Sequence, residues 1–150
     1  MSKKILLIIL LTMIGFPKSA PAELVQSWIP IFMQAAGLGM TTIWTIDMIK
    51  ADKIDISKGY VRAREPGSDA YLLPHWVAEY STASLLIAGA YGLQNDKPWA
   101  RDVSLVALGA LNYTGMNSLG WVFGKRERWS YAVPILLSLA GSTLSISILL

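Results

Sequence analysis

Four apolar segments, each close to the length needed to cross a lipid bilayer, constrain this chain more than any other feature of its sequence. They cover residues 24–49, 74–93, 99–123 and 129–150. A helix rises about 1.5 Å per residue, so each segment is comparable as a helix with the roughly 30 Å thickness of the hydrocarbon core. A soluble core of this size cannot bury four such helices. We therefore predict an all-α polytopic membrane protein, built as a four-helix transmembrane bundle.

The composition agrees with this prediction. Hydrophobic residues make up 53% of the 150 residues and charged residues only 15%, whereas about a quarter of a soluble domain is charged. The basic residues lie in short clusters between the apolar segments, so the net charge of +3 indicates membrane topology. We expect the lipid bilayer, and no nucleic acid, as a partner. The absence of cysteine and the single histidine, His75, exclude thiolate and multi-histidine metal sites within one chain.

The first 22 residues have the pattern of a secretory leader. Lys3 and Lys4 precede a short apolar run at 5–16, and the triplet Ala20-Pro21-Ala22 suits a signal peptidase. We predict a signal peptide cleaved after Ala22, with an uncleaved short anchor as the alternative. The transmembrane domain then covers residues 23–150.

The loops predict the orientation of the chain. The polar stretch 50–73 carries five Lys or Arg residues and the turn 125–128 carries three, whereas the link 94–101 carries two. Because cytoplasmic loops are enriched in Lys and Arg, we place the first two loops in the cytoplasm of a bacterial inner membrane and the C-terminus outside. The alternating charges of 50–73 allow a short surface helix or a hairpin, but no periodicity is clean enough to assign one.

Small residues and tryptophans indicate how the helices pack and where they meet the membrane surface. Helices in lipid associate through small residues, and we expect those of the last three segments to form contacts within one bundle, with a homodimer seam as the alternative. The Gly37-Leu-Gly39 pair is likewise a helix-packing feature. We predict that five tryptophans anchor helix ends at the interface. The small residues are Ala88, Gly89, Gly92, Gly109, Gly115, Gly120, Ser138, Gly141, Ser142 and Ser145, and the tryptophans are Trp28, Trp76, Trp99, Trp121 and Trp129.

Glu79 is the residue that most suggests a site, because an ionisable group inside a transmembrane helix is costly. His75 precedes it by four positions and Thr82 follows it by three, so the three share one helical face. Asn117 lies at nearly the same depth on the next, antiparallel helix, and Tyr113 is its i, i+4 neighbour. Asp47 lies about one turn shallower. The predicted site is therefore His75, Glu79, Thr82, Tyr113, Asn117 and Asp47, in the cytoplasmic leaflet.

Several roles remain open for this site. A buried polar network that fixes helix register is the simplest, because polar groups in a membrane need partners. A pocket for a small molecule or lipid headgroup is the next. Acid/base catalysis and proton-coupled transport through Glu79 follow, and a metal held by His75, Glu79 and Asp47 comes last. We assign no catalytic residue and no metal ligand, and the cofactor is unknown.

The C-terminal half resembles a known family. The sequence HWVAEYSTASLLIAG has the pattern His-x-x-Ala-Glu-x-x-Thr-Ala, and NYTGMNSLGW has Tyr-x-x-x-Asn-Ser. These patterns are similar to those of an uncharacterised family of small bacterial membrane proteins. The resemblance implies a four-helix integral membrane protein and no particular activity. Its residues are His75, Ala78, Glu79, Thr82, Ala83, Tyr113, Asn117 and Ser118.

We therefore expect a non-enzymatic protein that binds a ligand or serves as an accessory subunit of a membrane assembly. Its protein partner would be another membrane subunit or a second copy of the chain. The alternative is a small transporter or membrane enzyme that uses a polar site of His75, Glu79 and Asn117.

Overall fold

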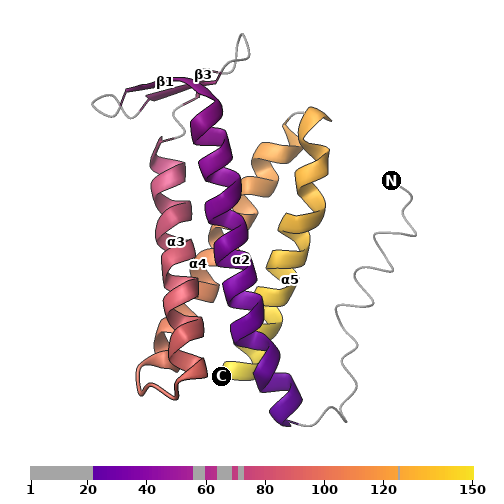
Figure 1. The fold of residues 1–150 in the computed structure, drawn as a ribbon. Coiled ribbons are helices and arrows are strands. Elements are labelled where there is room, and N and C mark those ends of the chain that lie inside the picture. The colour runs from indigo at the N-terminus through magenta and orange to yellow at the C-terminus, as the bar shows by residue number, and fades with distance from the viewer. Residues whose placement is uncertain (1–21, 56–59, 64–68, 71–72, 125) are drawn as a thin grey trace, which may run out of the picture.

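The computed structural model describes residues 22–55, 60–63, 69–70, 73–124 and 126–150. Helices dominate this part of the chain, as the sequence predicts (Figure 1). The 3-10 helix η2 (Arg126–Tyr131) joins the last two long helices. The predicted signal peptide lies outside the described residues, except for Ala22. The four long helices are α2 (Ala22–Lys50), α3 (Leu73–Gln94), α4 (Ala100–Phe123) and α5 (Ala132–Leu149).

Three short strands follow α2 in the polar stretch for which the sequence predicts no definite structure. They are β1 (Ala51–Asp55), β2 (Tyr60–Ala63) and β3 (Asp69–Ala70), and they form an antiparallel sheet in the order β1-β2-β3. The sheet covers the end of the bundle where α2 finishes and α3 begins (Figure 1). It adds a small β element to the helical fold. Strands of five, four and two residues are too short for alternation to reveal them.

The tight link between α3 and α4 is stabilised by backbone geometry. Asp96 has a positive φ of 48°, a conformation that Asp adopts more readily than most residues. The amide of Lys97 then donates a hydrogen bond to the carbonyl of Gly92 at 3.0 Å. This is the bond of a Schellman motif, and it satisfies a carbonyl that the end of α3 would otherwise leave unpaired.

Arg101, at the start of α4, holds the end of α5. Its Nε donates to the Leu149 carbonyl at 2.7 Å, and its Nη2 donates to the Leu150 carbonyl at 3.1 Å. A cation at the C-terminal end of a helix also interacts favourably with the helix dipole. The last helix is thereby tied to the start of the preceding one.

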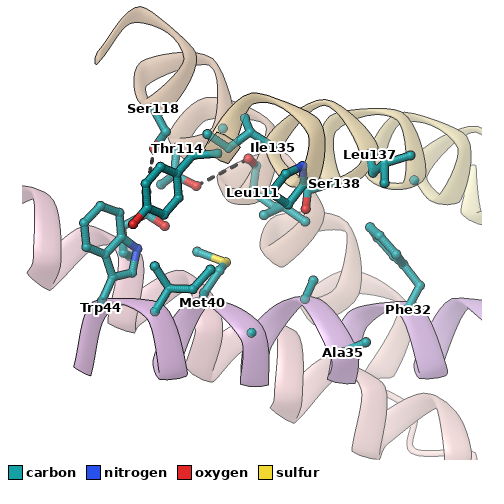
Figure 2. A pocket seen from close by; sticks show the side chains of 18 of the residues that line it. Phe32, Ala35, Met40, Trp44, Leu111, Thr114, Ser118, Ile135, Leu137 and Ser138 are labelled. Carbon is teal, nitrogen blue, oxygen red and sulfur yellow. Dashed lines mark hydrogen bonds between the residues drawn. The ribbon is translucent and has the colours of Figure 1, made fainter. Parts of the chain in front are cut away.

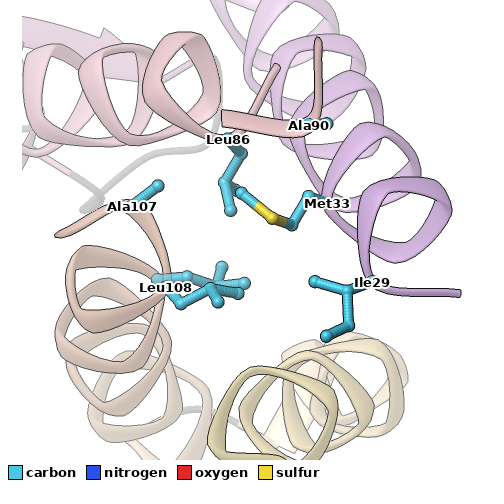
Figure 3. Packing of buried hydrophobic residues seen from close by; sticks show 7 residues of the cluster. Ile29, Met33, Leu86, Ala90, Ala107 and Leu108 are labelled. Atoms are coloured by element: carbon cyan, nitrogen blue, oxygen red, sulfur yellow. The ribbon is translucent and has the colours of Figure 1, made fainter. Parts of the chain in front are cut away.

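The hydrophobic core lies between α2, α3 and α4 (Figure 3). All three helices point side chains toward the same centre, and part of α5 packs against this cluster. Interiors of this kind are held by close van der Waals contact. The core residues are Ile29, Met33, Leu86, Ala90, Ala107, Leu108 and Leu111, and the residues of α5 packed against them are Ile146, Ile148 and Leu149.

Several of the predicted small residues lie in helix contacts. A Cβ atom at Gly89 would come within 2.8 Å of both the Met33 methyl group and the Ser104 hydroxyl. Ser142 and Ser145 are fully buried. Gly109 and Gly120 differ, because a Cβ atom at either position would meet nothing within 4 Å. Those two glycines of α4 therefore form no close helix contact with the described residues.

Ser142 and Ser145 allow a matched test of helix association. Ser142 Oγ donates across the interface to the Leu108 carbonyl of α4 at 2.7 Å, whereas Ser145 Oγ donates within its own helix to Gly141. We expect Ser142→Ala to lower the free energy of unfolding by roughly 0.6 kcal/mol, the average for interhelical hydrogen bonds in membrane proteins, and Ser145→Ala to change it less. Unfolding by SDS in mixed micelles measures both. An equal effect of the two substitutions would contradict this assignment.

The helices differ in their suitability for crossing a membrane. Two helical stretches among the described residues are long and apolar enough to cross a membrane. They are Ser27–Lys50 and Trp129–Leu149. The tryptophans also differ from one another. Trp99 and Trp129 are 41% and 43% exposed, but Trp76 is 1% exposed and packs against Trp44. The prediction that Trp76 is an interfacial anchor is therefore wrong, and it is a core residue.

Candidate functional site

Glu79 is the centre of a buried polar network. Its carboxyl accepts a hydrogen bond from Ser118 Oγ of α4 at 3.2 Å and one from the side chain of Trp44 of α2. His75, one turn earlier on α3, has its Nε2 atom 3.5 Å from the same carboxyl oxygen. The Glu79 side chain is only 3% exposed, so these partners replace the solvent that a carboxyl group needs. Three helices thus meet at one carboxyl group.

His75 has a defined orientation in this network. Its Nδ1 atom lies 3.2 Å from the amide nitrogen of Asn117, which can only donate a hydrogen bond. A neutral imidazole with an accepting Nδ1 carries its proton on Nε2, the atom that faces Glu79. The ring of Trp44 packs edge-on against the imidazole, with 4.8 Å between ring centroids and an interplanar angle of 86°. The network therefore continues from Asn117 through His75 to Glu79.

The structure brings together three of the six predicted site residues, His75, Glu79 and Asn117. Thr82 is buried, but its hydroxyl donates to the Ala78 carbonyl of its own helix at 2.9 Å. Tyr113 lies outside the network, since its side chain is 74% exposed.

Asp47 lines the same cavity as Glu79. Ser118 and Trp44 are partners of Glu79 that were not among the predicted site residues, although Ser118 belongs to the pattern Tyr-x-x-x-Asn-Ser. Ser118 directly follows Asn117, and Trp44 lies three positions before Asp47, so both were close to predicted positions.

A cavity of about 430 Å³ lies beside this network, between α2, α4 and α5 (Figure 2). Trp44 and Ser118 lie at one end, and Phe32 and Leu137 lie at the other. The walls between these ends are mostly apolar. They include Ala35, Ala36, Met40 and Ile43 of α2, Leu111 and Thr114 of α4, and Ile135 and Ser138 of α5.

The polar lining is concentrated at the end of the bundle nearest the sheet. Asp47 is in the last turn of α2, Glu79 is in the second turn of α3, and Tyr131 is the last residue of η2. At the opposite end, Phe32 packs against Gly141 so closely that a Cβ atom there would collide with the ring. The cavity is therefore elongated, with one polar end and one closed, apolar end. Such a shape matches a molecule with a polar head and an apolar body.

Comparisons with known proteins identify a family and no activity. No curated protein matches the sequence, and no solved structure matches it. Residues 23–149 match a family described as a domain of unknown function, DUF8058. This match covers almost all of the chain and includes every residue of the network and the cavity. The chain therefore belongs to the DUF8058 family.

Proposed function

We propose that this chain is a four-span membrane protein that binds an elongated, largely apolar molecule taken from the bilayer, without chemical conversion. The observation that carries the proposal is the cavity of about 430 Å³ between α2, α4 and α5. Its volume is within the range of about 300–1,000 Å³ that is typical of ligand pockets. The Glu79 network provides a polar end for such a molecule, and it also fixes the register of three helices.

The outer surface supports four spans. Large hydrophobic side chains are exposed on every long helix, as expected where lipid surrounds the protein. They include Ile31, Leu38 and Ile49 on α2, Val77, Ile87 and Tyr91 on α3, Val106, Tyr113 and Met116 on α4, and Val133 on α5. An ordinary soluble monomer exposes such residues singly and not along every helix.

Exposed hydroxyl groups give independent support for a lipid environment. A hydroxyl that faces lipid needs a partner on its own helix, because no water is available there. Thr42 of α2, Ser84 of α3 and Thr143 of α5 each donate to the carbonyl four residues earlier, at 2.8, 2.8 and 2.9 Å. Ser81 and Ser147 do the same. The exposed faces of these helices thus present few unpaired polar groups.

The distribution of charged residues supports the proposal that α3 and α4 also cross the membrane, although they are less apolar than the other two helices. Residues 80–95 and 103–123 contain no Asp, Glu, Lys or Arg. As helices these stretches rise about 24 and 31 Å, comparable with much or all of the hydrocarbon core. The basic loops follow α2 and α4, and the positive-inside rule therefore places the sheet and η2 in the cytoplasm. The setting is a bacterial-type inner membrane with the C-terminus outside.

The arrangement of helices gives the cavity a route to the bilayer. Consecutive helices pack side by side, whereas α2 and α5 touch at few positions. Phe32 and Gly141 form one of these contacts, at the apolar end. Toward the sheet, the two helices diverge (Figure 1), and both contribute residues to the cavity wall. A molecule from the bilayer would therefore enter between α2 and α5.

Gly39 permits a direct test of this function. It lines the cavity, and a Cβ atom there would meet nothing within 4 Å. We expect Gly39→Leu to fill part of the space and to weaken binding of 1-dodecanol, a neutral single-chain probe, at least tenfold. Native mass spectrometry of the full chain in a non-ionic detergent measures the bound probe. One dodecanol per chain is the expected result for the unsubstituted protein.

Gly109→Leu is the matched control. Gly109 is also a helical glycine with open space around its Cβ position, but it does not line the cavity. This variant should bind dodecanol as the unsubstituted chain does. Equal binding by Gly39→Leu and the unsubstituted chain would contradict the proposal, as would the absence of bound dodecanol in both.

A further inference from the structure

Phe32 closes the apolar end of the cavity. Its ring lies so close to Gly141 of α5 that a Cβ atom at position 141 would be 2.7 Å from Cζ of the ring. Trp28, one turn further from the polar end on α2, packs against the same ring with 5.5 Å between the ring centroids. Both aromatic residues also pack against the hydrophobic core, and Trp28 is not among the described residues of the cavity wall. The ring of Phe32 is therefore supported on the side away from the cavity.

The polar end of the cavity lies at a defined distance from this ring. Trp44 lines the polar end, and Ala35 and Met40 line the wall between Trp44 and Phe32 (Figure 2). Trp44 comes twelve residues after Phe32 on the same helix, which is a rise of about 18 Å at about 1.5 Å per residue. An extended alkyl chain advances about 1.3 Å per carbon, because its single bonds of about 1.5 Å zigzag. The apolar walls therefore match the length of a chain of about fourteen carbons.

We propose that Phe32 limits the chain length of the ligand, so that the cavity selects single-chain amphiphiles of up to about fourteen carbons. This inference rests on the proposed function and specifies its ligand class. A hydroxyl or other hydrogen-bonding head stays at the polar end, because moving it along the apolar walls would leave it without partners. A longer chain then reaches Phe32 before its last carbons are accommodated. Those carbons have to fold back into space that the rest of the chain already fills.

A competition between two neutral alcohols tests this proposal on the full chain in a non-ionic detergent. 1-Tetradecanol and 1-octadecanol are supplied in equal amounts, and native mass spectrometry measures the ratio in which they bind. Both alcohols partition into the micelles and carry the same head group, so the ratio reports the fit of the alkyl chain. We expect bound tetradecanol to exceed bound octadecanol at least tenfold.

Substitutions at Phe32 locate the selectivity. Phe32→Ala removes the ring and should reduce the preference for tetradecanol several-fold, because the additional carbons of octadecanol then occupy the space of the ring. Phe32→Leu keeps a smaller apolar side chain and should reduce the preference by a smaller factor. Ile31→Ala is the control, because Ile31 precedes Phe32 on α2 but is 63% exposed and does not line the cavity. If Phe32→Ala does not fold, as judged by helical content, Phe32→Leu still tests the inference.

The outcomes separate this inference from the proposed function. Equal binding of the two alcohols, or tighter binding of octadecanol, overturns the inference and leaves the proposed function intact. A preference that is unchanged in both Phe32→Ala and Phe32→Leu, or that falls equally in Ile31→Ala, also overturns it. Binding of 1-dodecanol without binding of tetradecanol has the same meaning. If none of the three alcohols binds, both the inference and the proposed function fail.

Discussion

Trp76→Ala is expected to lower the free energy of unfolding by about 3 kcal/mol, the low end of the range for truncating a buried aromatic residue. Trp76 is among the largest fully buried side chains of the described chain, at 1% exposure, and it packs with Trp44 beneath the sheet. The low end applies under the proposed membrane location, because a chain that unfolds in lipid or detergent keeps this side chain in an apolar medium. The loss then comes from van der Waals contacts and the cavity left behind.

Val77→Ala is the control for this prediction. Val77 is the next residue of the same helix, but its side chain is 59% exposed. Its truncation should change the stability by less than about 0.5 kcal/mol, as is usual for surface substitutions. Titration with SDS in mixed micelles measures both variants. A loss of stability in Val77→Ala equal to that in Trp76→Ala would show that burial in this bundle does not determine stability.

Trp76→Phe separates packing from hydrogen bonding. The indole N–H of Trp76 is buried and has no hydrogen-bond partner among the described residues. Phenylalanine removes this donor and keeps most of the ring contacts. The variant should therefore lose much less stability than Trp76→Ala.

The helices were predictable because their signal is long and repeated. A run of apolar residues near bilayer length has few structural alternatives, and all four segments are helical in the structure. The sheet was not predictable. Its strand β3 has two residues, and β1 contains a register shift between Ala51 and Lys53. Alternating polar and apolar residues cannot be recognised over such short and irregular strands.

Part of the network followed from spacing along one helix. His75 and Glu79 are four residues apart, so any helix brings them together. The predicted depth of Asn117 in the membrane also placed it near these two residues. Depth does not determine how α4 is rotated about its axis, and this rotation decides which side chains face inward. Tyr113 points outward, while Ser118, the neighbour of Asn117, donates to Glu79.

The cavity depends on distances between helices that are far apart in the sequence. It exists because α2 and α5 meet at Phe32 and Gly141 and diverge toward the sheet. Single-sequence periodicity describes the faces of each helix and contains no information on this divergence. Gly39 and Asp47 were visible in the sequence as a packing residue and a site residue, but their shared place in one cavity wall became apparent only from the assembled bundle.

Gly37→Leu is the second substitution with a large expected effect, a loss of about 3 kcal/mol, at the upper end of the usual cost of overpacking. A Cβ atom at Gly37 would lie 2.9 Å from the Ala83 carbonyl oxygen and 2.9 Å from Cγ1 of Ile87. The carbonyl is backbone and cannot rotate away. Any larger side chain must therefore push α2 and α3 apart, which disturbs the core that both helices share.

Gly39→Leu is the matched control for this prediction, two residues further along the same helix. Because its Cβ position is open, leucine there meets no backbone, and replacing glycine within a helix should gain up to about 1 kcal/mol. The two substitutions are chemically identical and should change the free energy of unfolding in opposite directions. If both substitutions destabilise the protein equally, the close contact between α2 and α3 is not the reason that position 37 requires a small residue. If the prediction holds, only one glycine of the Gly37-Leu-Gly39 pair serves helix packing, and the other serves the cavity.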